Sequence, residues 1–113
     1  MIGLLETRKI VLREDRNEDG YYYLAIRYSE NGDLLIEGQD LGPRAKEVFD
    51  CIEYQWLWTI KRENLELLKS RLSLPGGLLK SLKRLFAEEN ATNLYEFLCE
   101  NDIPFEKWSR TGD

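Results

Sequence analysis

Large apolar side chains occupy every second position in the segment IEYQWLWTI. They are Ile52, Tyr54, Trp56, Trp58 and Ile60, and they alternate with Glu53, Gln55, Leu57 and Thr59. Successive side chains of a β-strand point to opposite faces of its sheet, so a period of two predicts a strand with one buried face. This is the strongest strand signal in the chain.

The same period recurs earlier in the sequence. The alternating apolar residues there are Ile10, Leu12, Tyr22, Leu24, Ile26, Tyr28, Leu34 and Ile36. The run GYYYLAI is also rich in aromatic residues, which favour strands. We therefore expect four strands in all, between about residues 5 and 61.

An Asn-Gly pair in the stretch YSENGDLLIE indicates a hairpin between two of these strands. A two-residue loop would set Ile26 opposite Glu37 and place a carboxylate on the core face. A three-residue loop over residues 30–32, with Gly32 in a left-handed conformation, instead sets Ile26 opposite Ile36. Because a slip of one residue turns every side chain to the other face, the apolar pattern favours the three-residue loop.

The second half of the chain has the spacing of helices, with a period near 3.6. We expect helices over about residues 62–102. One apolar stripe begins at Leu65 and ends at SLPGG, because proline and paired glycines do not fit inside a regular helix. A second helix is expected from about Gly77, and a third from Asn93, where Asn93 and Glu96 have the spacing of a capping box.

Strands followed by helices predict an α+β fold. We expect a single domain over residues 1–113, with a four-stranded, mainly antiparallel sheet covered on one face by about three C-terminal helices. The other face should contact solvent. A short helical turn over residues 44–49 would precede the last strand. The tail, residues 103–110, is expected to be extended and to dock Phe105 and Trp108 on the core.

Composition excludes several kinds of chemistry. The chain of 113 residues has no histidine, so triads, zinc sites and phosphotransfer that need an imidazole are excluded. No glycine-rich phosphate loop is present, and two distant cysteines, Cys51 and Cys99, predict neither a disulfide framework nor a metal site. We expect no cofactor.

Charge bears on partners and location. The formal net charge of −5 disfavours binding to nucleic acid. We find neither an apolar span of bilayer length nor a secretory signal, so we expect a cytoplasmic protein without a membrane partner. Bases gather in residues 61–84 and acids in residues 88–106. These flanks are either ordinary solvated helix faces or functional patches.

Paired carboxylates are one candidate for catalysis. Glu37 could act with Asp40 or with Glu53 as the acid and base of a hydrolase. Such a pair usually sits in a deep pocket, and a domain of this size has little volume for one. The expectation is therefore a protein that is not an enzyme.

The loop DRNEDG is a weak candidate for a calcium site. It places oxygen ligands at Asp15, Asn17 and Asp19, in the order of a calcium-binding loop. The position that should hold a bidentate glutamate is Ile26, within a strand. An acidic hairpin loop is the favoured interpretation, and no metal site is predicted.

The outward face of the sheet is the favoured binding surface. The predicted partner-binding residues are Tyr21, Tyr23, Glu37, Gln39, Asp40, Glu53 and Gln55. Tyrosines mixed with acids and amides suit protein recognition, because tyrosine contributes much contact area at a low entropic cost. The alternative is an ordinary exposed sheet made of strand-forming residues. Trp56 and Trp58 should point the other way, into the core.

Several separated segments carry a resemblance. GYYYLAI, IEGQDLG, EYQWLWTI and IPFEKWSR together resemble a family of small acidic uncharacterised bacterial proteins. The resemblance covers most of the chain and implies a bacterial, cytosolic, free-standing domain. The family has no assigned activity, so no functional residue is transferred from it.

These observations favour a non-enzymatic, acidic protein-binding module with a basic protein partner. By analogy of size and charge, it could be an immunity-type inhibitor that neutralises a cationic bacterial toxin or nuclease. The alternatives are a small-ligand or calcium-binding domain, an inhibitor that mimics nucleic acid, and a carboxylate-dependent hydrolase.

Overall fold

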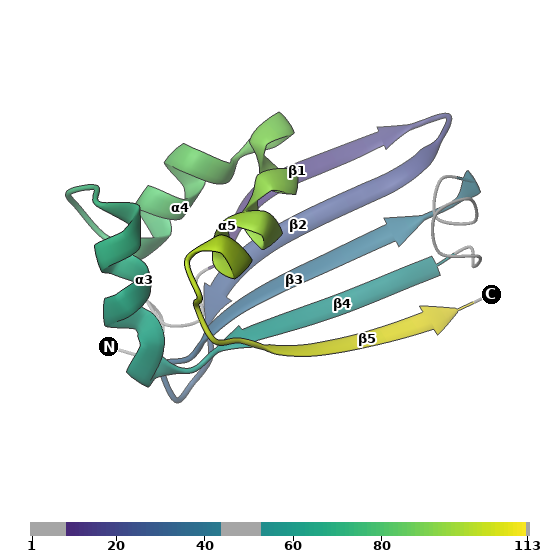
Figure 1. The fold of residues 1–113 in the computed structure, drawn as a ribbon. Coiled ribbons are helices and arrows are strands. Elements are labelled where there is room, and N and C mark those ends of the chain that lie inside the picture. The colour runs from purple at the N-terminus through teal and green to yellow at the C-terminus, as the bar shows by residue number, and fades with distance from the viewer. Residues whose placement is uncertain (1–8, 44–52, 113) are drawn as a thin grey trace.

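The computed structural model describes residues 9–43 and 53–112. In these residues five strands form one antiparallel sheet, in the order β1-β2-β3-β4-β5 (Figure 1). The strands are β1 Lys9–Asn17, β2 Gly20–Tyr28, β3 Leu34–Leu41, β4 Glu53–Ile60 and β5 Glu106–Gly112. The helices are α3 Leu65–Leu72, α4 Leu78–Phe86 and α5 Leu94–Glu100, with short 3-10 helices η1 Arg62–Asn64 and η2 Glu88–Asn93. The predicted α+β class is confirmed.

The sheet has one more strand than the sequence predicts. The tail is not merely docked, because β5 pairs antiparallel with β4 and sets Trp108 opposite Leu57. Phe105 does pack against the core, as predicted. Trp108 does not, since 53% of its surface is exposed. Strand β5 has a single large apolar side chain, so its sequence contains no apolar alternation to reveal it.

The predicted register of the β2–β3 hairpin is confirmed. Ile26 lies opposite Ile36, and Gly32 has a φ of 89°. The Ser29 amide donates to the carbonyl of Asp33 at 2.8 Å, and the Gly32 amide donates to the carbonyl of Ser29 at 3.1 Å. These bonds close a loop of three residues and fix which side chains face the helices.

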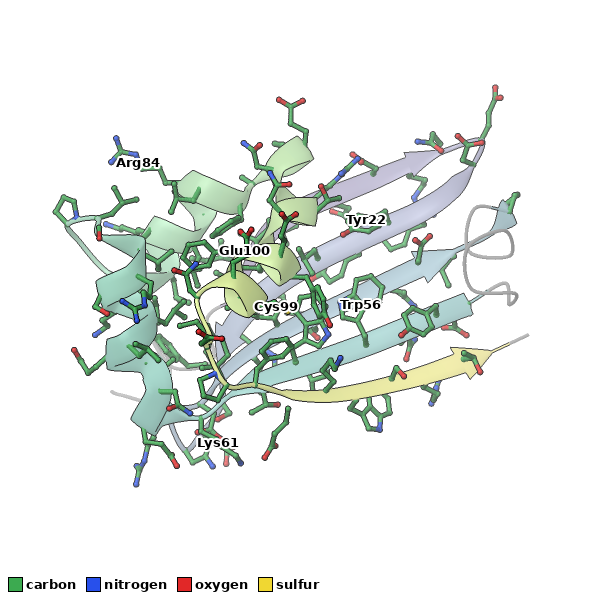
Figure 2. The ribbon with its side chains drawn as sticks, viewed as in Figure 1. Tyr22, Trp56, Lys61, Arg84, Cys99 and Glu100 are labelled. Atoms are coloured by element: carbon green, nitrogen blue, oxygen red, sulfur yellow. The ribbon has the colours of Figure 1, made fainter. Side chains whose placement is uncertain are left out.

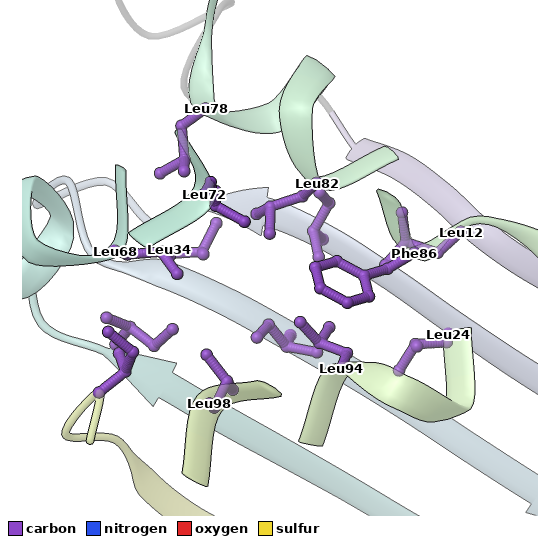
Figure 3. Packing of buried hydrophobic residues seen from close by; sticks show 14 of the residues in the cluster. Leu12, Leu24, Leu34, Leu68, Leu72, Leu78, Leu82, Phe86, Leu94 and Leu98 are labelled. Carbon is purple, nitrogen blue, oxygen red and sulfur yellow. The ribbon is translucent and has the colours of Figure 1, made fainter. Parts of the chain in front are cut away.

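The core lies between the helices and one end of the sheet (Figure 3). Its fully buried side chains are aliphatic: Leu12, Leu24, Ile26, Leu34, Ile36, Ile60, Leu68, Leu82, Leu94 and Leu98. Burial of each such side chain contributes about 1.5–3 kcal/mol. This aliphatic layer joins α3, α4 and α5 to strands β1 to β4.

The helices cover only part of the face on which they lie (Figure 1). Helix α4, with nine residues, is about 14 Å long, whereas a nine-residue strand is about 30 Å long. Beyond the helices the same face carries aromatic residues in place of aliphatic ones. Tyr22 precedes Leu24 and Ile26 on β2, and Trp56 precedes Ile60 on β4. The large rings therefore lie at the uncovered end.

Two further predictions about local structure have different outcomes. The prediction of a capping box at α5 is wrong, since the Asn93 side chain makes no capping hydrogen bond. Helix η2 runs directly into α5, so the Leu94 amide bonds to the carbonyl of Ala91 instead. The predicted turn over residues 44–49 lies outside the described residues. None of the described helices has the length and apolar character required to span a bilayer.

The fit between Gly38 and Trp56 gives a test of the sheet packing. Trp56 on β4 lies opposite Gly38 on β3, and its ring packs over the glycine. A Cβ atom at position 38 would overlap ring atoms of Trp56. We expect Gly38→Ala to lower the free energy of unfolding by about 1–3 kcal/mol, because Trp56 must move. Urea denaturation measures this change.

Gly77→Ala is the matched control, because a Cβ atom at position 77 meets nothing within 4 Å. Its effect should stay below about 1 kcal/mol, as expected for a helix N-cap of this type. Equal effects of the two substitutions would contradict the packing of Trp56 over Gly38.

Candidate functional site

Six of the seven predicted binding residues lie on the sheet face away from the described helices. The register places Tyr21, Tyr23, Glu37, Gln39, Glu53 and Gln55 there, and we call this surface the open face. Asp40 does not belong to it. It is adjacent to Gln39 on β3, so its side chain points to the helix-bearing face, where only 5% of its surface is exposed.

Hydrogen bonds connect the polar side chains of the open face. The Gln55 amide donates to Glu53 at 2.8 Å, and the Gln39 amide donates to the same carboxylate oxygen at 3.3 Å. Tyr21 donates its hydroxyl to Glu14 at 2.6 Å and stacks on Tyr23, with ring centroids 6.2 Å apart. The bond to Glu14 raises the pKa of Tyr21, so the phenol remains neutral at physiological pH.

Glu37 is neutralised by bases on two neighbouring strands. Its carboxylate lies 2.9 Å from the Lys9 ammonium and 3.5 Å from the Arg27 guanidinium. The hydrogen bond to Glu37 raises the pKa of Lys9 above its ordinary value, although partial desolvation opposes this. Glu37 therefore already has two basic partners within the chain, and it is not an isolated anion on this surface.

The described charged residues of the open face are electrically balanced. Its bases are Lys9, Arg16, Arg27 and Arg110, and its acids are Glu14, Glu37, Glu53 and Glu106. Any specificity of this surface must therefore come from its rings, amides and shape, because its charges largely cancel.

A shallow hollow of about 280 Å³ lies in the middle of the open face. Tyr23 and Gln39 line it together with Gln55, Leu57 and Trp108. Trp108 is the residue that sequence reasoning missed, because the tail was expected to bury it. Trp108 lies on β5, opposite Leu57 of β4, so its largely exposed indole is beside the predicted surface.

A second concave surface lies on the helix-bearing face, at the end that the helices leave uncovered (Figure 2). Its volume is about 400 Å³. We call it the aromatic cleft, and its lining residues are Tyr22, Asp40, Tyr54, Trp56, Trp58, Thr92, Tyr95 and Lys107. Strands β2 to β5 form its floor, while η2 and α5 form its wall.

The rings of the aromatic cleft are in contact with one another. The Trp56 ring centroid lies 5.6 Å from that of Tyr54 and 6.3 Å from that of Trp58, and Tyr95 lies 5.2 Å from Trp58. Trp56 and Trp58 point to the helix-bearing face as predicted, but both are only half-buried. The change from aliphatic to aromatic residues along β2 and β4 is the sequence signal that could have revealed this cleft.

The carboxylate pairs considered for catalysis are not brought together. Asp40 and Glu37 lie on opposite faces of the sheet. Glu53 shares the open face with Glu37, but Glu37 lies opposite Leu57, four residues along β4 from Glu53. That offset is about 13 Å, whereas a catalytic carboxylate pair is separated by about 5–9.5 Å.

The candidate calcium loop is a tight hairpin between β1 and β2. The Asn17 side chain accepts the amide hydrogen of Asp19 at 2.8 Å and closes the turn, while Asp15 pairs with Arg13. Among residues 9–43 and 53–112 we find no cluster of three or more side chains that could hold a metal ion. The segment does form the hairpin turn that the sequence favours.

The charged flanks lie on different helical segments. The exposed bases Lys80, Lys83 and Arg84 are on α4, beside β1, and the exposed acids of the 88–106 segment follow on η2 and α5. Glu106 does not join these acids, because it points to the open face. The acids of this segment therefore occupy two surfaces, which disfavours their use as a single mimic of a nucleic-acid backbone.

Comparison with known proteins assigns no family. No protein-family model, curated protein or solved structure gave a significant match to this chain.

The pair between Lys9 and Glu37 gives a test by pH. The pKa of Lys9 is raised in the folded state, so its pairing with Glu37 stabilises the fold. This contribution has its full value at pH values below the unfolded-state pKa of about 10.4. This stabilisation is lost as the pH rises through the folded-state pKa. We expect Lys9→Met to cost at most about 1 kcal/mol near neutral pH, because Lys9 is partly exposed. The difference from the wild type should narrow above about pH 10.4.

Urea denaturation at several pH values measures these stabilities. Lys83→Met is the matched control, since Lys83 is exposed on α4 and has no ion-pair partner in the described part of the chain. A Lys9→Met difference that stays constant with pH would contradict the role of this pair.

Proposed function

We propose that this chain is a non-enzymatic protein-binding module and that its partner binds the open face. The observation that carries the proposal is the gathering of Tyr21, Tyr23 and Trp108 around the amides of Gln39 and Gln55 on one sheet face. Rings of this kind supply most of the binding energy in protein interfaces, and amides supply adaptable hydrogen bonds.

The preorganisation of this surface supports the same interpretation. Glu53 holds both glutamine amides, and the stack of Tyr21 on Tyr23 orients two rings before any partner arrives. Side chains that are already ordered lose less entropy on binding. Acidic and basic side chains in equal number lie towards the ends of the open face. They could form a polar rim around the aromatic centre of an interface.

The proposed partner is a basic protein. The net charge of −5 would attract it over long range, although the open face itself is balanced. An immunity-type inhibitor that neutralises a cationic toxin or nuclease fits this combination. On this proposal the chain acts in the cytoplasm by covering a surface of its partner, and it needs no cofactor.

Titration against the protein encoded by the neighbouring gene tests this function. We expect Tyr23→Ala and Gln39→Ala each to weaken binding about tenfold or more, which corresponds to about 1.4 kcal/mol or more. Isothermal titration calorimetry measures the affinity. If the partner is basic, rising salt should slow association and weaken binding.

Lys83→Ala is the control, because Lys83 lies on α4, on the other side of the sheet. It should leave the affinity unchanged, and circular dichroism should show that all three variants fold. Binding that is unaffected by Tyr23→Ala and Gln39→Ala would place the partner elsewhere, and no binding would overturn the assignment of this partner.

The aromatic cleft favours a second candidate function, the binding of a small organic cation. Its volume of about 400 Å³ lies within the range of small-molecule sites. Tyr54, Trp56 and Trp58 contribute aromatic rings to the lining, and Asp40 contributes a carboxylate. A cation already lies at the edge of the cleft, since the Lys107 ammonium is 5.4 Å from the ring centroid of Tyr95. Ring faces beside a carboxylate are the chemistry that recognises ammonium groups.

Tryptophan fluorescence during titration with benzyltrimethylammonium tests this candidate. We expect saturable quenching, and about fivefold weaker binding in Tyr95→Ala, since one wall is lost. The neutral analogue neopentylbenzene is the matched probe, and it should bind more weakly. Equal quenching by both probes would show that charge plays no part, and no saturation would remove the candidate.

A further inference from the structure

Strand β5 ends the described sheet with an unpaired edge. It hydrogen-bonds to β4 on one side, and no described strand or helix lies beyond it on the other (Figure 1). Alternate backbone N–H and C=O groups of an outermost strand point away from the sheet and can pair with another strand. The residues 106–111 are all exposed.

This edge carries charged side chains, but in the described residues it lacks a proline, a shift in its pairing and a covering element, which are other common protections of an edge strand. Strand β5 has seven residues and no proline, and its pairing with β4 runs from Glu106 to Gly112 without a shift. The opposite edge is different, because β1 has an irregularity between Val11 and Arg13 and carries α4 and η2 beside it. Bulges and covering elements protect edges from pairing, so β1 has both kinds of protection, whereas β5 has neither in the described residues.

The sequence of β5 is complementary to itself in the antiparallel direction. When two copies are centred on Trp108, each Glu106 lies opposite the Arg110 of the other copy. Lys107 then lies opposite Ser109, and the two Trp108 side chains lie opposite each other. Opposite charges and paired aromatic rings at facing positions of antiparallel strands each contribute favourably. No like charges face each other in this register.

The side chains concerned are free to make these contacts. Trp108 is 53% exposed, the largest exposed fraction among the large hydrophobic residues that the structure describes. Glu106 is 69% exposed and lies 3.8 Å from Lys61, at the long limit of an ion pair. Arg110 has no ion-pair partner in residues 9–43 and 53–112. All three point to the open face, so they would meet on one side of the joined sheet.

We propose that two copies of this chain associate through antiparallel pairing of their β5 strands, centred on Trp108. The contact is isologous, with a two-fold axis perpendicular to the sheet, and it closes after two copies. Five strands from each copy would form one sheet of ten. The helices of both copies would lie on one side and both open faces on the other.

Sedimentation equilibrium of the purified chain alone tests this proposal over a wide concentration range. The wild type should show a monomer–dimer equilibrium. Arg110→Glu should weaken the dimer at least tenfold, since it creates two Glu–Glu contacts by symmetry. Glu106→Arg should weaken it similarly through two Arg–Arg contacts. The double variant Glu106→Arg with Arg110→Glu should restore the dimer, because it exchanges the charges and keeps both pairs.

The control is Lys83→Glu, which changes the net charge by the same amount as Arg110→Glu at an exposed site on α4. It should leave the dimer constant within about twofold. Circular dichroism should show the same fold for every variant. Ser109→Pro should also weaken the dimer, because it introduces a ring into the middle of the edge strand.

Three outcomes would overturn the proposal: a wild type that remains monomeric at millimolar concentration, a double variant that does not regain the dimer, or a dimer that is not weakened by Arg110→Glu, Glu106→Arg or Ser109→Pro. These measurements contain no other protein. They therefore fail or succeed independently of whether the open face has the proposed partner.

Discussion

The register of the β2–β3 hairpin determines the surfaces of this protein. The hydrogen bond from the Ser29 amide to the Asp33 carbonyl and the left-handed conformation of Gly32 fix the register of the two strands, which places Ile26 opposite Ile36. Asp33 also accepts the amide hydrogen of Arg62 at 2.9 Å, which ties the loop to the segment that leads into α3. A slip of one residue would exchange the two faces of β2 or β3. The core, the open face and the aromatic cleft all depend on this loop.

The second organising constraint is the length of the helical layer. The helices are too short to cover the strands from end to end, so the helix-bearing face is divided into a dry end and a partly wet end. Aliphatic side chains occupy the dry end, where they have no polar atom to satisfy. Tyrosine and tryptophan occupy the other end, where their large rings are only half-buried. The aromatic cleft is therefore a consequence of incomplete coverage.

Sequence reasoning predicted what depends on local pattern. Alternation identified β2, β3 and β4, and the apolar stripe and the SLPGG break identified α3 and α4. The Asn-Gly pair indicated the hairpin, and the apolar alternation then set its register. It missed β5, whose strand conformation depends on hydrogen bonds to the distant β4. It grouped Asp40 with Glu37 although the two differ by an odd number of residues and so face opposite ways. The capping box failed because η2 precedes α5 and already supplies a partner for the first helical amide.

The location of Trp108 links the open face to the edge of the sheet. Within one copy it lies beside Leu57 at the margin of the hollow, so a partner on one copy meets a rim that ends at β5. Joined at β5, two copies would make Trp108 the centre of a longer surface, with the rings of Tyr23 some distance away on either side. A partner with two equivalent sites would then gain affinity through effective concentration, without new contacts in either site. A single-site partner would gain only the additional Trp108. The dependence of affinity on the concentration of this chain would therefore distinguish the two kinds of partner.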